Sequence, residues 1–127
     1  MAIGAELAQA LRNFARQEGE IVKLGQRVAP DNALEFVRMR RGLVMCFAEV
    51  GAAMEKDVWL TAQPPEMIQR GRQLFSALRA ANSINQANWP VVKARDDPQG
   101  YQVAARPVGE KSHAFWMWVE MELGFKK

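Results

Sequence analysis

The stretch that decides the fold is FWMWVEMELGF, residues 115–125. Its apolar side chains recur at every second position, and glutamates at 120 and 122 fall between them. A period of two residues is that of a β-strand, whose successive side chains point to opposite faces of a sheet. A helix through the same residues would spread this apolar row around its axis, so we expect a strand. The row consists of Phe115, Met117, Val119, Met121, Leu123 and Phe125.

Two further β-prone segments precede this strand. They cover residues 91–95 and 101–106, and the sequence DDPQG at 96–100 joins them. Aspartate, proline and glycine in a connection of this length are typical of a hairpin turn. The segment 89–125 is therefore predicted to form a three-stranded antiparallel meander.

The chain before residue 89 has the three-and-four apolar spacing of amphipathic helices. One helix is predicted over residues 3–28, ending before Pro30. A second starts after a cap at Asp31 or Asn32 and runs to about residue 58. A third begins at Pro64 or Pro65 and loses its apolar pattern after Ala81. The fold class expected is α+β: three long helices forming a helical bundle over residues 3–88, with the meander of residues 89–125 packed on it.

Composition and length suit one ordinary globular domain spanning residues 1–127. Apolar residues make up 49% of the chain and charged residues 24%. Cys46 is the only cysteine, which excludes an internal disulfide and favours a reducing compartment. The start does not resemble a signal peptide, and the longest apolar run, residues 42–54, is shorter than the roughly 20 residues that cross a membrane. We expect a cytoplasmic protein that does not enter a membrane.

The strand prediction places two indoles on the side opposite the apolar row. Glu120 would lie on the same side of the strand as Trp116 and Trp118. The three residues would then form a solvent-facing surface, and exposed aromatic patches mark contact sites. The alternative is that the rings are covered within the monomer, since tryptophan is usually buried. This surface, together with the broad apolar surface of the second, central helix around residues 42–54, predicts a non-catalytic assembly subunit that binds a protein partner or a second copy of itself as a homodimer. The compact, cysteine-poor chain suggests a bacterial or phage complex.

Two other functions are compatible with the sequence. Arg38, Arg40 and Arg41 form a basic run that could bind nucleic-acid phosphates, although the net charge is only +3 and acidic residues are plentiful nearby. A weaker alternative is a small-molecule pocket between sheet and helices. Its lining would be Trp89, Phe115 and Met117.

Catalytic motifs are scarce in this sequence. His113 is the only histidine, so a multi-histidine metal site has no support. The glycine-rich nucleotide-binding and nucleophile-elbow signatures do not occur. We therefore expect no enzyme activity, and we assign no catalytic, cofactor-binding or metal-binding residue.

Overall fold

The computed structural model describes residues 2–127, and within that range the chain forms helices and no strand. Helices account for 83% of the protein, so the predicted α+β class, with its antiparallel sheet, is wrong, whereas the helical bundle is confirmed. The elements are α1 (Ala5–Gly25), α2 (Ala33–Lys56), α3 (Val58–Thr61), α4 (Pro65–Asn88), α5 (Val91–Asp96) and α6 (Pro98–Trp118), followed by the π-helical turn η1 (Val119–Leu123).

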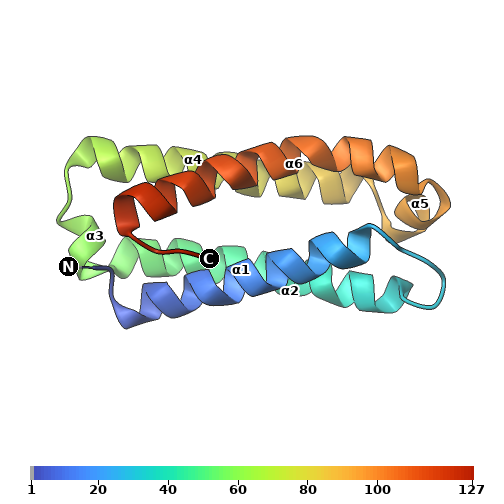
Figure 1. Ribbon diagram of the computed structural model, residues 1–127, viewed down its shortest axis with the longest axis horizontal. Helices are drawn as coiled ribbons and strands as arrows, with labels where there is room; N and C mark the ends of the chain where they lie inside the picture. The colour runs from blue at the N-terminus through green and yellow to red at the C-terminus, as the bar shows by residue number, and fades with distance from the viewer. Residues whose placement is uncertain (1) are drawn as a thin grey trace.

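The long helices form an elongated bundle of two antiparallel pairs (Figure 1). One pair is α1 with α2 and the other is α4 with α6, and the contacts within each pair are the densest in the molecule. The short helix α5 lies at one end, where α4 turns into α6, and α3 lies at the opposite end. After η1 the chain turns back, so that its last residues run between α6 and α1 (Figure 1).

The three predicted helices are present, with shifted ends. α1 and α2 begin and end within a few residues of the predicted bounds, and α4 begins at Pro65 as expected. α4 continues past Ala81 to Asn88, through a segment that the sequence presents as a helix terminator. Asn82 explains part of this extension, because it lies four residues after buried Leu78 on the inner stripe of α4 and is itself buried.

The predicted hairpin at DDPQG is wrong because the same residues start a helix. The side chain of Asp97 accepts a hydrogen bond from the backbone N–H of Gly100 at 3.0 Å, and Pro98 occupies the first turn of α6. Aspartate before proline suits a helix N-terminus as well as a turn. The aspartate side chain accepts a hydrogen bond from a backbone N–H of the first turn, and proline, which lacks a backbone N–H, is tolerated there because that position makes no intrahelical bond. Residues 91–95 and 101–106, predicted as strands, lie in α5 and α6 instead.

The predicted last strand is also helical, as the end of α6 followed by η1. At about 100° per residue, its buried side chains cover an arc of roughly 160° on one side of the helix. Trp118 lies at one edge of this arc and Trp116 at the other, while Met117 is on the opposite side and 45% exposed. The buried set is Phe115, Trp116, Trp118, Val119 and Leu123.

The main core is an aromatic cluster in the half of the bundle nearer α3. Phe14 stacks on Trp116 with 5.4 Å between ring centroids, and Phe75 contacts Phe47 and Phe115 at 5.7 and 5.2 Å. A smaller cluster at the α5 end is built around Phe36 and Tyr101. The space between the two clusters is where the helices separate.

Candidate ligand-binding cleft

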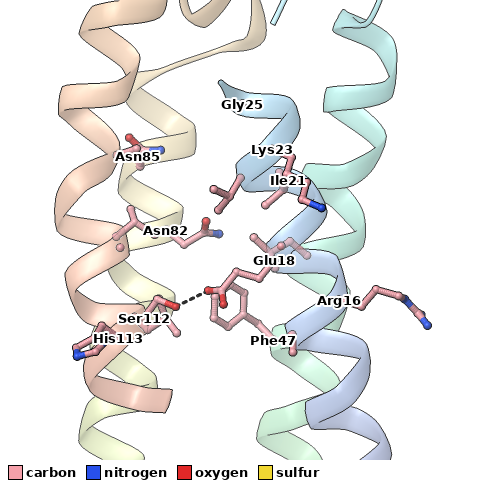
Figure 2. Close-up of a pocket in the computed structure, with 18 of the residues that line it drawn as sticks. Arg16, Glu18, Ile21, Lys23, Gly25, Phe47, Asn82, Asn85, Ser112 and His113 are labelled. Carbon is pink, nitrogen blue, oxygen red and sulfur yellow. Dashed lines mark hydrogen bonds between the residues drawn. The ribbon is translucent and has the colours of Figure 1, made fainter. Parts of the chain in front are cut away.

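A cleft of about 1100 Å³ lies between α1 and α6, with α2 and α4 behind it (Figure 2). It exists because both walls carry small residues, among them Gly19 on α1 and Ala105 and Gly109 on α6. A Cβ atom added at Gly19 or Gly109 would meet no other atom within 4 Å. The two helices are therefore held apart over this stretch, and no side chain of residues 2–127 fills the gap.

Hydrogen bonds connect α1 and α6 at two points along the cleft. At the α5 end, Gln102 Nε2 donates to the carbonyl oxygen of Gly25 at 2.9 Å. At the other end, Glu18 accepts from Ser112 Oγ at 2.7 Å and from Trp116 Nε1 at 2.9 Å. From Glu18 to Gly25 the helix rises about 10 Å, and from Gln102 to Ser112 about 15 Å. The opening is thus suited to a short molecule, since a longer helix laid along it would meet both bridges.

The floor of the cleft changes from apolar to polar along α4. Phe47 and Leu78 form its apolar part, and the next inward positions of α4 are Asn82 and Asn85. Figure 2 shows the side chain of Asn82 pointing into the space between the helices, and Asn85 Oδ1 is buried without a hydrogen-bond partner within residues 2–127. Asn82 is only 6% exposed. Buried amides normally have partners, so these side chains give the cleft unused hydrogen-bonding capacity.

Arg40 is a buried cation at the α5 end of the cleft. It is 8% exposed, and its Nη1 donates to the carbonyl oxygen of Trp89 at 2.7 Å, just beyond the C-terminus of α4. Its guanidinium lies 4.5 Å from the ring centroid of Phe36 and 5.7 Å from that of Tyr101. Within residues 2–127 its Nη2 has no hydrogen-bond partner, and no carboxylate forms an ion pair with it. Nearby on α4, Asn85 Oδ1 and Gln86 Nε2 are likewise buried without partners.

The cleft is lined by seven lysines or arginines and by one acid, Glu18. The carboxylate of Glu18 is engaged by its two hydrogen bonds and has Lys127 Nζ at 3.9 Å. Arg16 points away from the space in Figure 2, so its positive charge acts from the rim. The six basic residues besides Arg40 are Arg12, Arg16, Lys23, Arg106, Lys126 and Lys127.

The surface predicted from the last strand does not exist. Trp116 and Trp118 are 6% and 5% exposed, because α6 is a helix that places one indole against Phe14 of α1 and the other against Gly71 of α4. Glu120 is exposed, on the outer side of η1. The expected grouping of these three residues on a solvent-facing side is therefore wrong. A role for them in partner binding stays a prediction, without the exposed indoles on which it depended.

The arginine run is divided between surface and interior. Arg38 and Arg41 are exposed on α2, whereas Arg40 is buried. On a helix, residue 40 lies roughly 200° from residue 38 and 100° from residue 41, so the three cannot share one face. The basic cluster proposed for nucleic acid is not brought together, although nucleic-acid binding itself stays a prediction.

The predicted small-molecule pocket also has the wrong lining. Phe115 is fully buried in the aromatic core, Met117 is on the outside, and Trp89 is half-buried near the α5 end. None of the three lines the cleft. The sequence signals that do belong to it are the run Asn82, Asn85 and Gln86 in a helix and the glycines of α1 and α6.

The broad apolar surface expected on the central helix is partly exposed. Val44 and Met45 of α2 are 47% and 63% exposed, while Leu43, Phe47 and Val50 face the core. Assembly through this surface stays a prediction. Among residues 2–127, none of the helices is both long enough and apolar enough to span a bilayer.

Cys46 on α2 should react slowly with alkylating reagents. Burial raises the pKa of its thiol, Glu49 raises it further, and Arg16 opposes the shift. A raised pKa leaves less thiolate at about pH 8, and the thiolate is the reactive form. We expect iodoacetamide to modify the folded protein several-fold more slowly than the denatured chain at the same pH, with the difference narrowing as the pH rises. Equal rates in the two states would contradict this prediction.

No protein-family model matches this chain, and neither does any curated protein or solved structure. Within residues 2–127 there is no group of three or more side chains suited to holding a metal ion. The interpretation of the cleft therefore relies on its own geometry.

Proposed function

We propose that this protein binds a small amphipathic organic molecule in the cleft between α1 and α6. The observation that carries the proposal is a cleft, bridged at two points by hydrogen bonds, whose floor combines apolar side chains with buried amide atoms that lack partners within residues 2–127. Ligand sites in proteins are concave, mostly apolar and supplied with a few polar groups that fix orientation. Their usual volumes, about 300 to 1000 Å³, are close to the volume of this cleft.

The walls support a ligand better than a simple packing defect. A cleft of this size deprives its lining atoms of contacts that a filled core would provide. At Gly19 and Gly109, on opposite walls, an added Cβ atom has open space around it, so side chains could be accommodated there. Glycine within a helix is also less favourable than leucine or alanine. The chain thus carries two unfavourable residues where their chief effect is to keep the cleft open.

Filling the cleft from both walls should remove binding and leave the fold intact. We expect Gly19→Leu combined with Gly109→Leu to melt at a higher temperature, because each change raises helix propensity by up to about 1 kcal/mol. The same variant should lose binding of Nile red, a neutral apolar dye, as measured by fluorescence titration.

The matched control is Gly19→Ala combined with Gly109→Ala. It gives a similar gain in helix propensity but adds only one methyl group at each site, so dye binding should persist. Equal dye binding by the wild type and the leucine variant would show that the dye binds elsewhere and would overturn the proposed site. Absence of dye binding by the wild type would also count against it.

A further inference from the structure

Building on the proposed function, we propose that the ligand of the cleft is a small organic carboxylate whose acid group binds Arg40 and whose apolar body lies along Phe47 and Leu78. This assignment names the chemical class and the orientation of the molecule. It depends on charge and on the order of residues along the floor, whereas the proposed function depends on the shape of the cleft and on the mixture of apolar and amide groups in its floor.

The first argument is the missing counter-ion of Arg40. A buried arginine such as Arg40, which is 8% exposed, is normally paired with a carboxylate, because removing a charge from water is costly. Here the compensation is partial: one carbonyl oxygen, that of Trp89, and two aromatic rings. The free Nη2 donor and the nearby free amide donor of Gln86 both require an acceptor. A carboxylate supplies two acceptor oxygens and the opposite charge, and arginine binds it with particular strength.

The second argument is the sign of the charge around the opening. Seven basic residues against one acid produce a positive potential that attracts anions and raises their local concentration. The single acid, Glu18, is already bonded to Ser112 and Trp116. A cationic ligand would therefore meet the repulsion of the rim and find one engaged carboxylate inside.

The third argument is the order of the lining residues. Along α2 the inward positions run Arg40, Leu43, Phe47, and along the antiparallel α4 they run from Asn85 back to Leu78. The cation and the free amides thus lie toward α5, and the apolar side chains lie toward the aromatic core. A molecule with an acid at one end and a short hydrocarbon body fits this order in one direction only.

The test compares ligands of equal length on the wild-type protein. Octanoate, octan-1-ol and octylamine differ in their head group alone, and isothermal titration calorimetry can measure all three. We expect octanoate to bind about tenfold or more tightly than the other two, because a hydrogen bond to a charged group adds this much. In the variant Arg40→Met, which keeps the apolar stem, octanoate should lose this advantage while octan-1-ol binds as before.

Each outcome has a separate meaning. Octanoate and octan-1-ol binding equally to the wild type would overturn the carboxylate assignment and leave a cleft that accepts neutral molecules. The carboxylate assignment would also be overturned if octanoate neither binds nor displaces Nile red, while Nile red binding is still lost when Gly19 and Gly109 are replaced by leucine. If Arg40→Met does not fold, the three ligands measured on the wild-type protein still decide the assignment. A preference for octanoate over octan-1-ol that disappears in about 1 M salt would place the selectivity on the exposed rim and overturn the role of Arg40.

Discussion

Replacing Trp116 and Trp118 together with threonine is expected to leave the protein largely unfolded at room temperature. Both indoles are more than nine-tenths buried, one stacked on Phe14 and the other packed against Phe115. Truncating one buried aromatic residue costs about 3 to 5 kcal/mol, and two such losses approach the whole free energy of unfolding of a typical domain, about 5 to 15 kcal/mol. The double variant also buries two hydroxyl groups and removes the hydrogen bond from Trp116 to Glu18. Circular dichroism with a urea titration would measure the loss.

The matched control is the replacement of Met117 and Met121 with threonine. These residues are 45% and 73% exposed, so the change should alter the free energy of unfolding by about 1 kcal/mol or less. The two pairs alternate along the same segment, and a strand would reverse the result, because it would direct the methionines into the core. A stable tryptophan variant with an unfolded methionine variant would therefore contradict the helical assignment.

The last segment was mispredicted because its sequence satisfies two periods. Apolar residues at every second position indicate a strand, but Phe115, Trp116, Val119 and Leu123 also follow the three-and-four spacing of a helix. Nearly every residue from 115 to 119 is apolar, so periodicity alone could not separate the two readings. Tertiary contacts select the helix over the strand, because α1 and α4 flank α6 and provide partners for indoles at both edges of a wide buried face.

α1, α2 and the start of α4 could be predicted because prolines mark these boundaries. Pro30, Pro64 and Pro65 interrupt the helical pattern, and the predicted bounds of α1 and α2 were close to those observed. The segment at Asp97 and Pro98 lacked this clarity, since those residues suit either a turn or a helix start. The local sequence was therefore enough to predict the structure where it fits one conformation, and not enough where it fits two.

The cleft could not be predicted because its parts come from four helices. Ser112 bonds to Glu18 across 94 positions of the chain, and Gln102 bonds to Gly25 across 77. Which helices are neighbours decides whether such residues meet. Arg40 is an example. The sequence indicates a surface cation in a basic run, whereas its position on α2 turns the side chain toward the interior, where it lines the cleft.

Adding a single methyl group at Gly71, in the second turn of α4, is expected to destabilise the protein severely. Alanine is ordinarily the better helix former by about 1 kcal/mol. At this position, however, a Cβ atom would overlap Cζ2 and Cη2 of Trp118 and lie 2.7 Å from Cε2. The indole is 5% exposed and stacks with Phe115, so the rigid ring cannot move aside without disturbing the aromatic core. We expect a net loss of about 3 kcal/mol in the free energy of unfolding, at the upper end of overpacking costs.

The comparison that isolates the cause is Gly109→Ala, the same substitution inside α6 where the new Cβ would meet nothing within 4 Å. It should stabilise the protein, so the two alanine variants are expected to shift the urea midpoint in opposite directions. Combining Gly71→Ala with Trp118→Phe removes part of the ring that the methyl group strikes. Because the two residues are in contact, the double variant should lose less than the sum of the single losses. Additive losses, or a neutral Gly71→Ala, would mean that α4 and α6 do not pack as closely as the indole against Gly71 requires.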